Sequence, residues 1–240
     1  MTVLEPAAEM PGGGISRRPL HFIILADCSG SMRGDKIQAL NFAIADMLPH
    51  LANWERDQEL AQVMIRAIAF ADAPQWHIEV PTPVSSLRWT PLRHVDRGRT
   101  NMGSAFELAA TALAPGQLER RALRPALLLI TDGLPTDPPG RFDAGLEALL
   151  ALPAGGRALR LAVAIGRDAQ SDALTRFIAD VTVPVLVADN TEEIADRLVA
   201  ASIAASRMSE VGVDRAALAQ QLLQPAVGEG PELFDRDTIV

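Results

Sequence analysis

Five oxygen-bearing side chains in this sequence have the types and positions that suit a divalent cation. Asp27, Ser29 and Ser31 alternate along the segment DCSGS, which directly follows an apolar run. Such a turn can direct a carboxylate and two hydroxyls toward one point, and hard cations such as Mg²⁺ prefer oxygen ligands. Two further candidates lie downstream, Thr100 in GRTNMG and Asp132 in ITDG. We therefore interpret these five residues as one predicted metal site: Asp27, Ser29, Ser31, Thr100 and Asp132.

The elements that must position these residues follow an alternating pattern. Apolar runs predict strands at residues 23–26, 63–70, 126–131, 159–165 and 183–187, with a short strand at 76–80. Helical spacing of apolar residues predicts helices at 37–51, 104–113, 142–150, 172–180 and about 190–208. Pro49 is expected to end the first helix, and Asn190 or Thr191 to cap the last. The alternation predicts an α/β fold, a doubly wound and mostly parallel sheet with helices on both faces.

This topology explains how distant residues can meet. Asp27 follows the first strand and Asp132 follows the fourth. In the doubly wound strand order 3-2-1-4-5-6 these two strands are neighbours, and ligands bind where the strand order reverses. Thr100, on the loop before the next helix, can reach the same edge of the sheet. We expect the five oxygen donors to converge there.

Length and composition restrict the class of protein. The 240 residues, 48% of them apolar, suit one domain with extensions, which we place at 20–206 between a flexible leader at 1–19 and an acidic extension at 207–240. No apolar run approaches the roughly 20 residues of a membrane span, and residues 1–14 lack a signal-peptide pattern. The net charge of −8 argues against a nucleic-acid partner, and the single cysteine fits a cytoplasmic protein.

The five candidate ligands resemble the metal-ion-dependent adhesion site of von Willebrand factor A domains. The segment TDGLPTD, together with GSAF after Thr100, is most similar to the bacterial tellurite-resistance TerY branch. The resemblance, over residues 20–206, implies that the hydroxyls bind Mg²⁺ directly and that Asp27 and Asp132 support the ion or contact it directly. Mn²⁺ and Ca²⁺ remain alternatives to Mg²⁺. The resemblance further implies a protein partner that supplies an Asp or Glu to the metal, with no membrane and no enzymatic activity.

The TerY resemblance also implies a biological setting and reveals two departures. In that branch the domain is often encoded beside a protein kinase and a PP2C-type phosphatase, in stress or tellurite-resistance signalling. Cys28 stands where Thr or Ser is usual, but this is not a ligand position. The cysteine-rich zinc-binding extension of some relatives is absent from this sequence, which has no second cysteine.

Other interpretations of the same residues remain open. Asp27 could be the nucleophile of a haloacid-dehalogenase-like phosphatase, although Ser29 then stands where that class has its acid–base Asp. The domain could also be a subunit of a chelatase or AAA-ATPase assembly, with the ATPase on another chain. Asp137 fits a turn or capping residue better than a ligand, and Cys28 fits a packing residue better than a catalytic thiol.

Overall fold

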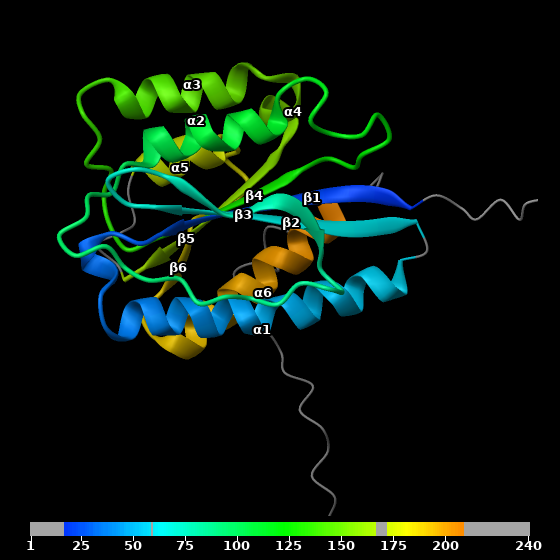
Figure 1. Ribbon diagram of the computed structural model, residues 1–240, viewed down its shortest axis with the longest axis horizontal. Helices are drawn as coiled ribbons and strands as arrows, with labels where there is room; N and C mark the ends of the chain where they lie inside the picture. The colour runs from blue at the N-terminus through cyan, green and yellow to red at the C-terminus, as the bar shows by residue number, and fades with distance from the viewer. Residues whose placement is uncertain (1–16, 59, 167–171, 209–240) are drawn as a thin grey trace, which may run out of the picture.

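Six strands form one sheet in the order β3-β2-β1-β4-β5-β6 in the computed structural model (Figure 1). Their bounds are β1 Arg18–Asp27, β2 Ala61–Phe70, β3 Gln75–Pro83, β4 Ala126–Thr131, β5 Leu159–Ile165 and β6 Leu186–Ala188. Neighbouring strands are parallel except β3, which pairs antiparallel with β2. The predicted fold class and strand order are therefore confirmed.

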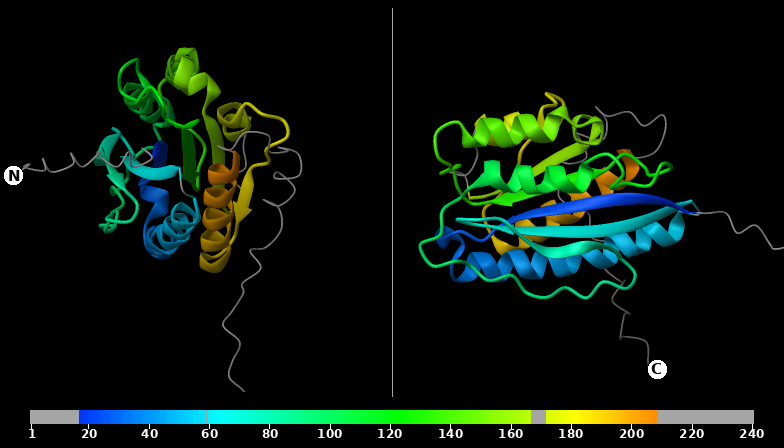
Figure 2. Two further views of the ribbon diagram at one scale, coloured as in Figure 1. Left: turned by 90° about the vertical axis from the view of Figure 1, so that its right-hand side faces the viewer. Right: turned by 45° about the horizontal axis from the view of Figure 1, so that its top comes forward.

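Helices cover both faces of this sheet (Figures 1 and 2). One face carries α2 Met102–Leu113, α3 Arg141–Ala151, α4 Pro153–Arg157 and α5 Asp172–Ile178, and the other carries α1 Asp35–Asp57 and α6 Thr191–Met208. A short 3₁₀ helix, η1 Gly30–Met32, follows β1. Because both faces are covered, every residue of β4 and β5 is buried.

The structure describes residues 17–58, 60–166 and 172–208. The predicted leader and extension therefore lie almost entirely outside the described residues. Within them, none of the helices combines the length and the apolar character needed to cross a bilayer.

Three local predictions were wrong or incomplete. α1 does not end at Pro49 but continues to Asp57, because Leu51 and Glu55 remain buried on the same stripe and packing outweighs the missing N–H of proline. The last strand is Leu186–Ala188 rather than 183–187, and α4 was not predicted. Asn190 does cap α6, since its Oδ1 accepts a hydrogen bond from the Glu193 N–H at 2.9 Å.

Candidate metal site

The turn after β1 is organised around the buried carboxylate of Asp27, which is 0% exposed. Its Oδ1 accepts a hydrogen bond from the Ser29 N–H at 2.8 Å, which closes the turn. Its Oδ2 accepts one from Thr131 Oγ1 at 2.6 Å, across to the end of β4. Asp27 therefore joins the carboxyl ends of the two central strands, at the point where the strand order reverses.

Ser29, Ser31 and Asp132 form a continuous chain of oxygen atoms at the same edge. Ser29 Oγ lies 3.0 Å from Ser31 Oγ, and Ser31 Oγ donates a hydrogen bond to Asp132 Oδ1 at 2.7 Å. Adjacent oxygen ligands of an octahedral Mg²⁺, each about 2.0–2.1 Å from the ion, are about 2.8–3.0 Å apart. Ser31 is exposed whereas Ser29 is buried, so the chain opens to solvent at Ser31. These spacings fit a small divalent cation.

Thr100 is placed beside this chain by residues that follow β4. Its N–H donates to Thr136 Oγ1 at 2.7 Å, and its carbonyl accepts a hydrogen bond from the Thr136 N–H at 2.9 Å. A Cβ atom added to Gly133 would lie 3.6 Å from Thr100 Oγ1, so this hydroxyl lies next to the residue that follows Asp132. The structure therefore brings Thr100 to the end of β4, as the topology predicted.

The long loop that carries Thr100 is anchored on both sides. On α1, Asn41 Oδ1 accepts hydrogen bonds from Leu92 N–H at 2.7 Å and Trp89 Nε1 at 3.1 Å, and its amide donates to the Leu92 carbonyl at 2.9 Å. On the β1 turn, the Gly30 N–H donates to the Gly98 carbonyl at 3.0 Å. A Cβ at Gly30 would lie 2.9 Å from the Arg97 nitrogen, so glycine permits this close approach.

Asp137 is a capping residue in the structure. Its Oδ1 accepts a hydrogen bond from the Gly103 N–H at 2.9 Å, in the first turn of α2. A carboxylate at this position satisfies a helix N–H group that has no partner within the helix. Asp137 thus holds the start of α2, immediately after Thr100.

Burial raises the pKa of two groups in the β1 turn. The pKa of Asp27 is raised to about 6, chiefly because burial penalises its charged form, and the hydrogen bonds from Thr131 and Ser29 limit the rise. Burial, with the nearby Asp27 charge, raises the pKa of the Cys28 thiol to about 12. A thiol with such a pKa stays protonated and is a poor nucleophile.

Three residues of this edge were not identified by sequence reasoning. Thr131 and Thr136 hold Asp27 and Thr100, and the Lys36 ammonium pairs with Asp132 Oδ2 at 2.5 Å. Thr131 and Thr136 lie within the TDGLPTD segment, and Lys36 is the only lysine of the chain. Within the described ranges, no group of three His, Cys, Asp or Glu side chains could hold a metal. A cation at this edge therefore depends on the hydroxyls.

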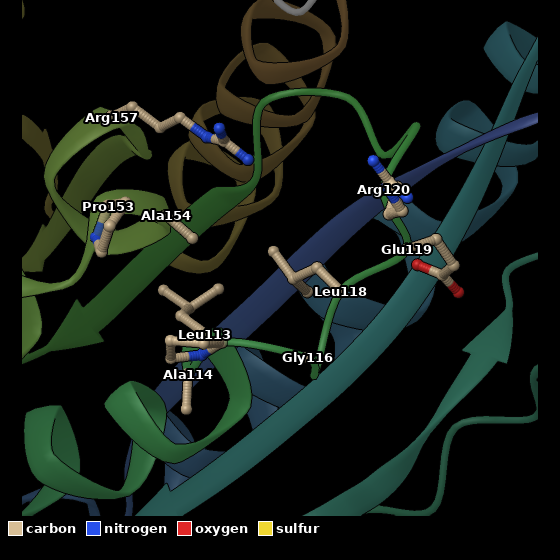
Figure 3. Close-up of a pocket in the computed structure, with 10 residues that line it drawn as sticks. Leu113, Ala114, Gly116, Leu118, Glu119, Arg120, Pro153, Ala154 and Arg157 are labelled. Carbon is tan, nitrogen blue, oxygen red and sulfur yellow. The ribbon is translucent and has the colours of Figure 1, made fainter.

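A cavity of about 230 Å³ lies away from these residues (Figure 3). It is lined by the end of α2, the following loop and α4, including Leu118, Arg120 and Arg157. Because α2 starts beside Thr100 and ends at this cavity, the cavity and the predicted metal site are separated by the length of the helix. None of the five candidate ligands lines it.

The doubly wound sheet, with oxygen donors gathered at its switch point, has the fold of a von Willebrand factor A domain. The family described as von Willebrand factor type A domain matches residues 22–134, a range that includes all five candidate ligands. No curated protein sequence matches the chain.

Solved structures support the same fold. The chain is similar to a von Willebrand factor type A protein from Catenulispora acidiphila, with a TM-score of 0.55 and 16% identity over 86% of this chain and 43% of that one. It is similar to the ArnB paralog VWA2 from Sulfolobus acidocaldarius, with a TM-score of 0.54 and 15% identity over 77% and 45%. Proximal thread matrix protein 1 of the mussel byssus, with a zinc-occupied MIDAS motif, has a TM-score of 0.58 and 14% identity over 78% and 48%. This chain spans less than half of each of those three chains.

Proposed function

We propose that this chain is a divalent-metal-dependent protein–protein interaction module. The observation that carries the proposal is the convergence of Asp27, Ser29, Ser31, Thr100 and Asp132 at one edge of the sheet. The zinc-occupied motif in the mussel protein supports a divalent metal for this fold. We propose Mg²⁺ as the resident ion, with Mn²⁺ or Ca²⁺ as substitutes, because the donors are all oxygen atoms.

The donor set favours a carboxylate from a partner. When bound, the ion acts as an electrophile that attracts an additional oxygen ligand. Three of the five donors are neutral hydroxyls, so much of the ion's positive charge remains for that ligand. We propose that an Asp or Glu side chain of a protein partner supplies it.

Exposed apolar side chains beside the donors support a protein as the partner. Val95 is 41% exposed, and its N–H donates to the Cys28 carbonyl at 2.7 Å, which places it against the β1 turn. Leu134 is 55% exposed and lies two residues after Asp132. Contacts that surround a central interaction exclude water from it in protein interfaces, and exposed apolar side chains beside the donors can make such contacts. We propose that Val95 and Leu134 contact the partner around its acidic residue.

The experiment that tests the metal site is calorimetric titration of the metal-stripped protein with Mg²⁺, Mn²⁺ and Ca²⁺. We expect saturable binding at one site, lost in Asp132→Ala and retained in Asp96→Ala. Asp96 is the matched control, because its side chain is 94% exposed on a neighbouring loop. Equal metal affinity in wild type and Asp132→Ala would contradict the proposal that these five residues bind the cation.

The biological setting is proposed on the TerY resemblance alone. We propose a non-enzymatic, cytoplasmic role in bacterial stress or tellurite-resistance signalling, together with a protein kinase and a PP2C-type phosphatase. Binding of either protein should require Mg²⁺, and it should be abolished by EDTA and by Ser29→Ala. Binding that persists with EDTA would show that the partner uses a different surface.

A further inference from the structure

Lys36, the second residue of α1, contacts Asp132, one of the two buried carboxylates of the predicted metal site. Its Nζ lies 2.5 Å from Asp132 Oδ2. The Asp132 side chain is 0% exposed, whereas the Lys36 side chain is 46% exposed. A carboxylate removed from water needs a compensating charge or hydrogen bonds, and Lys36 supplies both. The ammonium therefore offsets the charge of Asp132 from the solvent side.

The two oxygens of Asp132 have separate partners. Oδ1 accepts the hydrogen bond from Ser31 and belongs to the chain of candidate ligands, whereas Oδ2 accepts from Lys36. Lys36 thus contacts the oxygen that does not face Ser31. By holding Oδ2, the ammonium directs Oδ1 toward the hydroxyls.

The net charge of the side chains around the site affects how tightly a cation binds at this edge of the sheet. The five candidate ligands include two carboxylates, Asp27 and Asp132, and Lys36 offsets one of their two negative charges. A positive charge within several ångströms of a divalent ion repels it and weakens its binding. The same reduction in negative charge leaves the ion more electrophilic toward an incoming carboxylate.

We propose that Lys36 is a charge-balancing residue of the metal site, which orients Asp132 and lowers the affinity for the resident cation. The inference rests on the proposed function, because it assumes a cation at the five donors. It predicts that removal of the Lys36 charge strengthens metal binding, the opposite of what the loss of a ligand does.

The first test measures Mn²⁺ affinity by calorimetry in wild type, Lys36→Met and Lys36→Arg. Removal of one positive charge near a divalent ion at high effective dielectric should tighten binding about tenfold in Lys36→Met. Lys36→Arg keeps the charge and should bind like wild type. Arg33→Met is the matched control, because Arg33 is an exposed basic residue between η1 and α1 whose side chain has no hydrogen bond or ion pair among the described residues. Should Lys36→Met fail to fold, Lys36→Gln replaces it.

The second test needs no metal. Because Lys36 is the only lysine, reductive methylation with ¹³C-formaldehyde labels a single side-chain amine, which NMR distinguishes from the α-amine. A dimethylated amine keeps its positive charge and one N–H donor. In the metal-free protein we expect the Lys36 signal to shift in Asp132→Asn and to stay unchanged in Asp96→Asn.

The outcomes separate this inference from the proposed function. Equal or weaker Mn²⁺ binding by Lys36→Met, with normal binding by wild type, overturns the role of Lys36 while the metal site stands. Absence of Mn²⁺ binding in every variant overturns both. An unshifted Lys36 signal in Asp132→Asn overturns the ion pair on which the inference depends.

Discussion

Gly103 at the start of α2 and Gly145 in α3 lie in direct backbone contact. A Cβ atom at Gly145 would penetrate the carbonyl group of Gly103, and a Cβ at Gly103 would penetrate the carbonyl of Arg141. The absence of both side chains lets the two helices pack closely. Because Gly103 follows Thr100 by three residues, this contact also determines where the Thr100 loop enters the helix.

Gly145→Ala should destabilise the protein by about 1–3 kcal/mol, since an added methyl group in a close contact forces a backbone shift. Denaturant unfolding followed by circular dichroism measures the effect. Gly133→Ala is the control, because its Cβ would make an ordinary contact of 3.6 Å with Thr100 Oγ1. Equal stability of Gly145→Ala and wild type would show that α2 and α3 can move apart without a loss of unfolding free energy.

The raised pKa of Asp27 predicts a pH-dependent stability in the metal-free protein. Its folded pKa of about 6 exceeds the ordinary value of 3.8 for an aspartate, so ionisation of Asp27 disfavours the folded state. This penalty is absent below pH 3.8, grows between the two pKa values and is complete above pH 6. Relative to Asp27→Asn, wild type should therefore lose about 1–2 kcal/mol of unfolding free energy between pH 5 and 7.5. Urea unfolding at both pH values, with a chelator present, measures the difference; a constant difference would contradict it.

The Cys28 thiol should be unreactive in the folded protein. It is 2% exposed, and its pKa of about 12 leaves almost no thiolate at pH 8. Ellman's reagent should therefore react with native protein far more slowly than with protein in denaturant. Rapid reaction of the native thiol would show that the β1 turn opens readily.

Asn41→Ala should release the loop that leads to Thr100, because its side chain holds Trp89 and Leu92 through three hydrogen bonds. We expect faster amide hydrogen exchange in residues 87–95, with a loss of about 1–3 kcal/mol in stability. Asn53→Ala is the control, because Asn53 also lies on α1 and its side chain is hydrogen-bonded to the exposed Arg56 and to no other residue that the structure describes. Unchanged amide hydrogen exchange in residues 87–95 would show that contacts other than those of Asn41 hold the loop in place.

The order of the strands and the meeting of Asp27 with Asp132 followed from sequence patterns alone. Continuous apolar runs identified the central strands β1 and β4, and the doubly wound order made them neighbours. The approach of Thr100 also agreed with that topology. Metal binding by these residues stays a prediction, because their positions alone do not determine their affinity for a cation.

Other features depended on contacts between distant parts of the chain, which no local pattern records. Pro49 favoured a helix end, yet the burial of Leu51 and Glu55 carries α1 through it. The role of Thr136 depends on a hydrogen bond to a residue 36 positions away. The pairing of Lys36 with Asp132 spans 96 positions, and a lone lysine gives no sign of its partner.

The contact between Ser31 and Asp132 joins residues that are 101 positions apart in the chain. Such a contact forms only after β4 has docked beside β1, and the closure of so long a loop is slow. A cation at these donors would therefore find its complete binding site late in folding. It would extend the lifetime of the native state by slowing unfolding, and it would leave the rate of folding nearly unchanged.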